Sequence, residues 1–448
     1  MSEEKKAAAP EKRKTWADKT TESAKMANKL LKKYYAKAAA ASDEGRPVAW
    51  VMNSSVVDGL LEPMGIASVF TENYATAAAA NQGGLAMIET AEKEGYPDNI
   101  CSYARTGIGH AILRNQCGFV NPEWPRGGMP DPDLLVGSSA NCEPRYKWYQ
   151  QIRRYHNVPF FCAETSMARI YAGVDPKEVE PYVVKAIAAE VRRGKDFFEK
   201  HTGRKLDMDR LMESVKQGER TCDWWWKCTE LCKHVPCPMP VEDFIASVPL
   251  AIMYKEEPES EQFFRMQYEE LQNRIANNLS VIPEEKYRLL WGWGLPIYSY
   301  LRIFNIMEEF GAVPVTMTAI NCFRSYTDET FEKYTDPFER MALGKFRLTN
   351  HSIGRANAMH VTQDVLDVIE FCRDFHCDGV VLNSTPSCRP RTIGQMAAIE
   401  MLRNTGIPVL VMENDMTDSR TVDEVKIRND LEMFMEVVDS AKRRREGH

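Results

Sequence analysis

From Pro47 onwards, short apolar runs alternate with longer segments whose apolar residues recur at helical spacing. Short apolar runs bounded by turn residues are typical of buried strands, and their alternation with helices is typical of a mostly parallel sheet. The alternation occurs twice along the chain. The strands expected from it are 48–52, 66–70, 133–139 and 158–164 in the first series, and 288–294, 312–320, 378–384 and 407–415 in the second. Helices expected between them include 75–94, 145–155, 300–311 and 392–406.

The stretch between the two series, residues 174–283, loses the strand pattern, and its spacing predicts helices. We therefore expect an α/β protein with two Rossmann- or flavodoxin-like lobes, each with a parallel sheet, joined by this helical segment. The lobes are expected at residues 46–173 and 284–448. Residues 1–45 are expected to form a disordered tail and then an N-terminal helical arm over 25–41.

The composition indicates a globular protein, because 44% of the 448 residues are hydrophobic and 27% are charged. The net charge of −7 argues against a nucleic-acid partner, and no apolar run is long enough for a membrane span. The first residues lack the apolar core of a signal peptide, so we expect a cytoplasmic protein. Twelve cysteines are many for that compartment, where structural disulfides are rare. Their places relative to the strands therefore need an explanation.

Three cysteines stand where ligands collect in an open parallel sheet, at or near the carboxyl ends of strands. Cys142 follows the expected strand 133–139, Cys388 follows the strand 378–384, and Cys101 lies at an expected helix start. Two of them belong to the first lobe and one to the second. If the lobes face each other, three thiolates converge on one site. The alternative, on the residues alone, is three ordinary buried thiols.

Several stretches that carry these cysteines resemble the 2-hydroxyacyl-CoA dehydratase and benzoyl-CoA reductase family. The resemblance extends over about residues 28–440, and the matching stretches follow the family's order. They are GRPVAW (45–50), FTENYATA (70–77), GYPDNICSYARTGIG (95–109), PDLLVGSSANCEPRYKWY (132–149), EEKYRLLWGWGLPIY (284–298), DGVVLNSTPSCRP (378–390) and IPVLVMENDMTDSR (407–420). Each stretch alone is modest, but their common order is specific.

The resemblance implies a [4Fe–4S] cluster held by Cys101, Cys142 and Cys388, with the fourth iron left to water or substrate. It implies a heterodimer with a related second cluster-binding subunit and an acyl-CoA substrate. It also implies a separate ATP-dependent iron–sulfur activator with reduced ferredoxin upstream. The sequence contains no phosphate-binding loop of the P-loop type, so we expect ATP to bind elsewhere than on this chain.

The resemblance further implies that a serine and a glutamate approach the substrate. Glu72, in FTENY, matches the glutamate and could act as an acid or base near the thioester. The serine falls on Ser54 or Ser55 in WVMNSSVV, and we take Ser55 as the candidate. The alternative interpretation is a helix-capping serine and a surface carboxylate.

Other cysteines and charged residues are expected to be structural. In TCDWWWKCTELCKHVPCPMP, the spacing matches neither a ferredoxin nor a zinc ribbon, so buried packing beside Trp224–Trp226 is preferred over an additional metal site. The cysteines of this segment are Cys222, Cys228, Cys232 and Cys237, and the others taken as structural are Cys117, Cys162, Cys322, Cys372 and Cys377. Asp415, Asp418 and Arg420, after the last strand, are expected to shape the cleft or the subunit contact.

The reaction type is less constrained than the family. The segments 282–315 and 382–395 are more similar to benzoyl-CoA reductases, whereas GRPVAW and CSYARTGIG are more similar to dehydratases. We expect electron transfer to an aryl-CoA with dearomatisation of the ring. The alternative is dehydration of an (R)-2-hydroxyacyl-CoA to a 2-enoyl-CoA. A third possibility is a non-catalytic iron–sulfur electron-relay subunit, which would need a fourth protein ligand or a shielded cluster.

Overall fold

The computed structural model describes residues 21–53, 55–139, 142–165, 170, 173–292, 294–319 and 324–447. Two four-stranded parallel sheets form its framework, which confirms the expected fold class. The first sheet contains β1 Val48–Val51, β2 Ala67–Phe70, β3 Leu134–Ser138 and β4 Phe160–Ala163. The second contains β5 Tyr287–Gly292, β6 Ala312–Met317, β7 Gly379–Ser384 and β8 Val409–Glu413. Each expected strand is present, with its ends shifted by at most a few residues.

Both sheets have the same strand order, β2-β1-β3-β4 in the first and β6-β5-β7-β8 in the second. This is the flavodoxin-like order. The chain adds its second strand on one side of the first strand and its third and fourth strands on the other side, so the strand order reverses between the first and third strands. At a switch point, the loops that leave two neighbouring strands diverge and open a crevice at the carboxyl edge. Each sheet therefore has one such position, beside β1 and β3 or beside β5 and β7.

Helices cover both sheets and connect them. Those of the first half are α1 Glu22–Ala41, α2 Thr71–Ala80, α3 Leu85–Lys93, α4 Ser102–Cys117 and α5 Glu143–His156. The helical segment contains α6 Pro176–Thr202, α7 Met208–Leu231, α8 Val241–Ile252 and α9 Pro258–Ala276. The second half has α10 Arg302–Glu309, α11 Pro337–Thr349, α12 Ile353–Ala358, α13 Gln363–Asp374, α14 Arg389–Thr392, α15 Gln395–Arg403 and α16 Glu424–Glu446.

The helix expected over 75–94 is two helices, α2 and α3, with a break at 81–84. Gln82 has a positive φ of 59°, which ends the first helix. The glycine after it is required by packing, since a Cβ on Gly83 would lie 2.5 Å from Cγ of Pro125. The sequence pattern missed the break because the apolar spacing continues through it.

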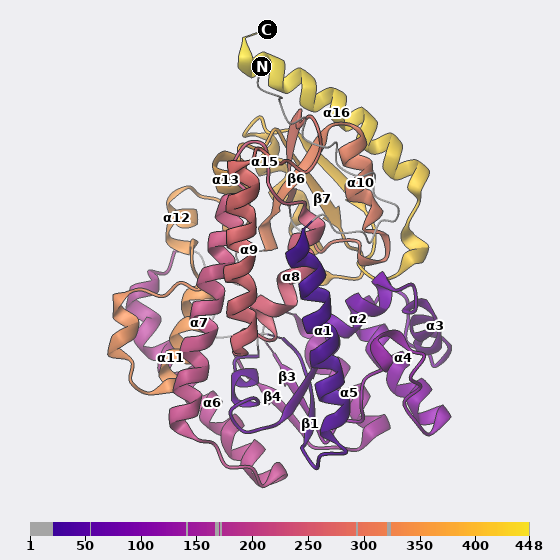
Figure 1. Ribbon diagram of the computed structural model, residues 1–448, viewed down its shortest axis with the longest axis vertical. Helices are drawn as coiled ribbons and strands as arrows, with labels where there is room; N and C mark the ends of the chain where they lie inside the picture. The colour runs from indigo at the N-terminus through magenta and orange to yellow at the C-terminus, as the bar shows by residue number, and fades with distance from the viewer. Residues whose placement is uncertain are drawn as a thin grey trace, which may run out of the picture.

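Figure 1 shows the first sheet in the lower half of the molecule and the second in the upper half, with α7 and α9 running alongside both. A single hydrophobic cluster joins the halves and includes Val51 and Val136 from the first sheet and Leu289 and Val381 from the second. Trp225 of α7 belongs to the same cluster and stacks on Phe244 of α8. The helical segment thus supplies core to both sheets rather than acting as a flexible link.

Candidate cysteine site between the two sheets

Cys142 and Cys388 lie at equivalent places in the two sheets. Cys142 follows β3 and is the N-cap of α5, while Cys388 follows β7 and is the N-cap of α14. Because β3 and β7 are the third strands of the same topology, both thiols stand beside a switch point. The expectation that these two cysteines follow strand ends is confirmed by the strand assignments.

Cys101 is the N-cap of α4, a helix start as expected, in the connection from β2 to β3. Each of the three thiols has a peptide N–H group nearby that acts to lower its pKa, although none of the thiols makes a full capping hydrogen bond. The N–H group belongs to the residue three positions after the cysteine, which is Ala104, Arg145 or Arg391. Exposed peptide donors near a sulfur stabilise a thiolate, which is the form that binds metals.

The three thiols lie within electrostatic reach of one another. Burial raises the pKa of Cys101, and the nearby thiols of Cys388 and Cys142 raise it further. Burial also raises the pKa of Cys388 to about 11, with Arg391 opposing it and Cys142 adding to it. All three residues are half-buried, so none of them belongs to the fully buried core. The structure thus brings together the three cysteines selected from the sequence.

Cys101, Cys142 and Cys388 are the residues here that could hold a metal cluster, because each contributes one thiol from a helix start and thiolates are the usual ligands of iron–sulfur clusters. In the described part of the chain, no three His, Cys, Asp or Glu side chains are placed to hold a single metal ion.

Glu72, in the first turn of α2, is joined to Arg145 rather than exposed on the surface. Nη2 of Arg145 donates to both carboxylate oxygens, at 2.7 and 2.9 Å. The same guanidinium donates to the side chain of Asn53, whose peptide N–H donates to Glu72 at 3.2 Å. Glu72 and Arg145 are both buried. Burial acts to lower the pKa of Arg145, but Glu72 and the Cys142 thiol raise it overall.

Two tyrosines from opposite halves of the chain meet next to this ion pair. Tyr103 belongs to α4, and Tyr298 begins the short 3-10 helix after β5. Burial raises the pKa of Tyr298 to about 12. The hydroxyl of Tyr103 acts to lower this pKa, and the carboxylate of Glu72 acts to raise it. Both hydroxyls therefore stay protonated near neutral pH. Tyr103, Tyr298 and Arg145 were not among the candidates selected from the sequence, although all three lie in the stretches that resemble the family.

The loop that carries Cys388 is fixed by the end of the last strand. The hydroxyl of Ser387 donates to Oδ2 of Asp415, and Oδ1 of Asp415 accepts from the peptide N–H groups of Thr417 and Asp418. The side-chain amide of Asn383, in β7, donates to the carbonyls of Leu295 and Asn414. The loops that follow β5, β7 and β8 are thus tied together beside the thiol.

A buried ion network connects the two halves near the site. Nη1 of Arg105, in α4, contacts Glu92 of α3 at 2.5 Å and Asp418 of the second half at 3.0 Å. Arg420 contacts the same two carboxylates, both at 2.6 Å. Burial acts to raise the pKa of Asp418, but Arg420 and Arg105 hold it below its ordinary value. Asp418 and Arg420 therefore join the two halves of the chain.

The remaining candidates lie apart from these contacts. Ser55 is fully buried, and its Oγ accepts from the peptide N–H of Asp58, so it caps the short 3-10 helix 57–60. Ser54 lies outside the described residues. The cysteines of the helical segment are buried and contact backbone carbonyls there, for example Cys228 with Phe264 at 3.2 Å.

Among the cysteines taken as structural, Cys372 and Cys377 are buried. Cys162 is only half-buried because β4 is an edge strand, and Cys117 is exposed at the end of α4. Cys322 lies outside the described residues.

Two flavodoxin-like sheets, each with a cysteine after its third strand, define a two-lobed α/β protein. Residues 56–438 match the family described as 2-hydroxyglutaryl-CoA dehydratase, D-component. The chain belongs to this family.

Relatives include the (R)-2-hydroxyisocaproyl-CoA dehydratase alpha subunit of Clostridioides difficile, 26% identical over 94% of this chain and 97% of the relative. A benzoyl-CoA reductase subunit of Thauera aromatica is 26% identical over 80% of each chain. The (R)-phenyllactyl-CoA dehydratase alpha subunit of Clostridium sporogenes is 24% identical over 90% of this chain and 92% of the relative. These relatives are named as subunits of larger enzymes. In addition, no helix among the described residues is long and apolar enough to cross a membrane.

Proposed function

We propose that the protein is the cluster-binding subunit of a dehydratase that converts an (R)-2-hydroxyacyl-CoA into a 2-enoyl-CoA. The reaction removes the 2-hydroxyl group and one hydrogen from carbon 3, and releases them as water. The observation that carries the proposal is the approach of Cys101, Cys142 and Cys388, from both halves of the chain, beside two switch points. Such a crevice is where open α/β sheets bind their ligands.

Cys101, Cys142 and Cys388 would hold a [4Fe–4S] cluster, and the donor set leaves one iron without a protein ligand. When bound, such a cluster supplies single electrons at low potential and an iron atom that can contact a thioester or hydroxyl oxygen. Arg145 and Arg391 stand three residues after two of the thiols, and each acts to lower the pKa of the thiol next to it. They would balance the negative charge of cysteine thiolates.

Glu72 is the candidate acid–base group, with Arg145 setting its direction. Because Arg145 binds both of its oxygens, the carboxylate can accept a substrate proton only through a lone pair that points away from the guanidinium. Tyr103 and Tyr298 keep their protons and would donate hydrogen bonds to the thioester carbonyl. Ser55 is engaged as a helix cap, so we give it a structural role instead of the expected catalytic one.

Dehydration is preferred over the ring reduction expected from the sequence. The matched family is described as a dehydratase component, and the relatives from Clostridioides difficile and Clostridium sporogenes are dehydratase subunits. Ring reduction stays as the second candidate because the benzoyl-CoA reductase subunit matches with an identity of 26% as well, over less of the chain. A pure electron relay is the least supported, since the cysteines of the helical segment are bonded within that segment and offer no fourth ligand.

The proposal includes a related second subunit, because the relatives are subunits of multi-subunit enzymes. It also includes a separate ATP-dependent iron–sulfur activator, reduced ferredoxin upstream of it, and a cytoplasmic location.

The test is anaerobic purification with the partner subunit and activator, followed by turnover assays with (R)-2-hydroxyacyl-CoA thioesters and benzoyl-CoA. A dehydratase returns its electron, so the 2-enoyl-CoA formed should exceed the ATP hydrolysed many-fold. A ring reductase should consume ATP in proportion to product. If the complex turns over benzoyl-CoA but none of the (R)-2-hydroxyacyl-CoA thioesters, the proposal is rejected in favour of ring reduction. An iron-free, fully folded complex would reject both.

A further inference from the structure

A cavity of about 330 Å³ lies at the opposite edge of the first sheet from the candidate site. It is bordered by the residues that enter β2, Gly65 to Ser68, and by Arg46 just before β1, so it opens at the amino ends of the strands. None of the candidate cysteines lines it, and neither do Glu72 and Arg145. Its volume falls at the lower end of the range of small-molecule pockets, about 300–1,000 Å³.

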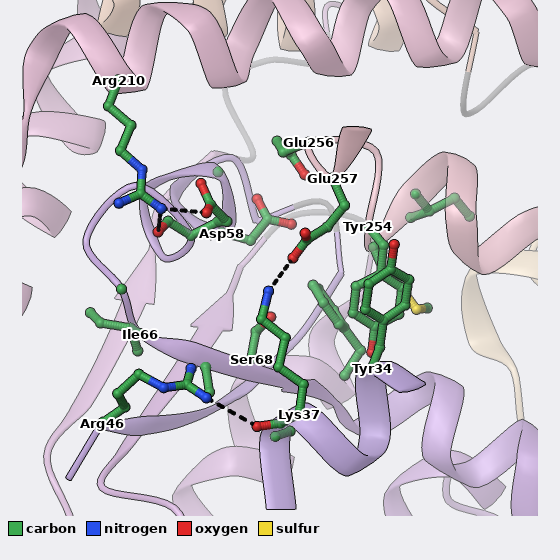
Figure 2. Close-up of a pocket in the computed structure, with 18 residues that line it drawn as sticks. Tyr34, Lys37, Arg46, Asp58, Ile66, Ser68, Arg210, Tyr254, Glu256 and Glu257 are labelled. Atoms are coloured by element: carbon green, nitrogen blue, oxygen red, sulfur yellow. Dashed lines mark hydrogen bonds and ion pairs between the residues drawn. The ribbon is translucent and has the colours of Figure 1, made fainter. Parts of the chain in front are cut away.

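One wall of the cavity is aromatic and apolar. The rings of Tyr34, from α1, and Tyr254, after α8, stack with their centroids 4.2 Å apart, as Figure 2 shows. Phe70 packs edge-on against Tyr254, and Ile66 and Ile252 extend the wall. This surface suits an apolar or aromatic group, because such groups gain free energy when they leave water.

A buried hydroxyl lies on this wall. Tyr34 is 3% exposed, and its Oη faces the hydroxyl of Ser260, a residue outside the cavity lining. A polar ligand atom in the cavity could add a second hydrogen bond at Oη of Tyr34, because a phenol hydroxyl both donates and accepts.

Each cationic side chain that lines the cavity is paired with a glutamate. Two carboxylates of the lining, Asp58 and Glu256, take no part in these pairs. The cation pairs are Lys37–Glu257 (2.8 Å), Arg210–Glu62 (2.5 Å) and Arg46–Glu44 (2.7 Å). Asp58 and Glu256 remain, of which Glu256 has only Lys255 at 3.8 Å. In Figure 2 Glu256 lies above the Lys37–Glu257 pair, and Asp58 lies on the side of that pair away from the tyrosine stack.

This arrangement selects the charge of the ligand. An anionic ligand would have to displace a carboxylate from one of the three existing ion pairs. A metal ion is disfavoured as well, because no three acidic, Cys or His side chains of the described chain are placed to hold one. A cation with a single ammonium group needs only the carboxylates of Asp58 and Glu256, next to the long 3.8 Å contact of Glu256 with Lys255, and its body can reach the apolar wall.

We propose that this cavity binds a small primary amine, with the ammonium group at Asp58 and Glu256 and an apolar or aromatic body against Tyr34, Tyr254 and Phe70. The site is separate from the cysteine crevice, so it stands whether or not the proposed reaction is correct. It makes the protein the receptor of a second small molecule besides its substrate.

The protonation of Glu256 offers an independent readout. Burial raises the pKa of Glu256 to about 7, with Asp58 and Glu62 adding to the rise and Lys255 opposing it. The other charged groups that line the cavity are held in the three ion pairs described above: Lys37 with Glu257, Arg210 with Glu62, and Arg46 with Glu44. A bound ammonium favours the ionised carboxylate, so binding near pH 7 should release protons to the buffer.

The test uses the full chain and 2-phenylethylamine as the probe, in isothermal titration calorimetry at pH 7 in two buffers of different ionisation enthalpy. Binding should be saturable, and the apparent enthalpy should depend on the buffer because protons are released. The uncharged analogue 2-phenylethanol and the anion 3-phenylpropionate should bind at least about tenfold more weakly.

Asp58→Asn and Glu256→Gln should each weaken 2-phenylethylamine binding by about tenfold or more, and Glu256→Gln should abolish the buffer dependence. Glu259→Gln is the matched control, since Glu259 lies outside the cavity and pairs with Lys33. Its affinity should equal that of the unchanged protein. Equal binding of the three probes, or unchanged affinity in both cavity variants with intact thermal melts, would overturn the proposal.

Discussion

Cys142 and Cys388 follow the third strands of two sheets that share one strand order, so the two thiols occupy equivalent positions in the two halves of the chain. Cys101 lies outside this correspondence, because it starts α4 in the connection between β2 and β3. The candidate ligand set therefore contains one cysteine from each switch point and one additional cysteine from the first half.

Replacing any one of these cysteines should remove most of the iron bound by this chain. Cys101→Ser, Cys142→Ser and Cys388→Ser each delete a thiolate that the resemblance assigns to the cluster, and a serine oxygen is a poor substitute for a soft thiolate. Iron and sulfide per chain, measured after anaerobic purification and supported by electron paramagnetic resonance, provide the readout.

Cys162→Ser is the matched control, since Cys162 is also half-buried but lies on edge strand β4. Its iron content should equal that of the unchanged protein. Full iron content in all three test variants would remove the cluster assignment.

Glu72 and Arg145 should be strongly coupled in stability. Arg145→Met leaves the Glu72 carboxylate buried without its partner, and we expect a loss of about 3–5 kcal/mol in the free energy of unfolding. Glu72→Gln should also destabilise, whereas the double variant should lose much less than the sum. Denaturant titrations of the four proteins give the coupling energy, and additive losses would show that the two side chains act independently.

Kinetics of variants at Glu72 and Arg145 should distinguish the group that transfers a proton from the group that only positions it. Arg145→Lys keeps the positive charge but loses the two-pronged contact, so we expect a lower kcat with a nearly unchanged KM for the acyl-CoA. Glu72→Gln should reduce kcat by about a hundredfold or more if Glu72 transfers a proton. Wild-type kcat in Glu72→Gln, in a variant with full iron content, would remove Glu72 from the reaction.

The ion network of Arg105 should be a major contributor to the junction between the halves. Arg105→Met leaves Asp418 and Glu92 with only Arg420 and should cost about 3–5 kcal/mol, since the Arg105 side chain is almost fully buried. Lys25→Ala, which breaks an exposed pair with Glu22, should leave the free energy of unfolding nearly unchanged. Equal losses in the two variants, measured by urea unfolding, would contradict the buried character of the network.

His110 should make the protein less stable in mild acid. Burial lowers the pKa of His110 from 6.5 to about 3, and its Nε2 accepts from the peptide N–H of Met129 at 3.0 Å. The unfolded chain then binds one more proton than the folded chain between about pH 3 and 6.5. Stability is therefore full above pH 6.5 and decreases as the pH falls through this interval.

His110→Gln keeps an acceptor near the position of Nε2 and does not titrate there. The free energy of unfolding of this variant should depend less on pH between 4 and 6, by about 1.4 kcal/mol per pH unit. His156, whose pKa burial lowers to about 4, remains in both proteins and contributes equally. Parallel pH profiles of the two proteins would mean that His110 is protonated without cost in the fold.

The strands could be predicted from the sequence because buried parallel strands are continuous apolar runs, as in VAWV and LLVGS. The rule that ligands collect at the carboxyl ends of such strands singled out Cys142 and Cys388, whereas their convergence was expected only if the two lobes face each other. The order of the strands was not accessible, because pairing depends on contacts between distant segments. Cys162 was expected to be structural, and its partial exposure follows from the edge position of β4.

The polar partners of Glu72 and Asp418 could not be found from the sequence either, because they come from distant segments of the chain. Arg145 meets Glu72 across 73 residues of sequence, and Arg105 meets Asp418 across 313 residues. One local signal was present for Arg145, which stands in the first turn of the helix that Cys142 begins. A cation is unfavourable in the first turn of a helix, because cations are stabilised at the opposite end. An arginine in that position therefore indicates an anionic partner elsewhere in the fold.

The continuous core sets how the protein can be divided. Met416, from the loop after β8, packs in the hydrophobic cluster of the first sheet with Trp50 and Trp148, and the larger cluster joins both sheets through the helical segment. A fragment ending at residue 283 would expose the apolar surfaces that the second half covers, and the complementary fragment would expose their counterparts. The halves are therefore expected to aggregate when expressed alone, whereas a nicked full-length chain should stay associated during gel filtration.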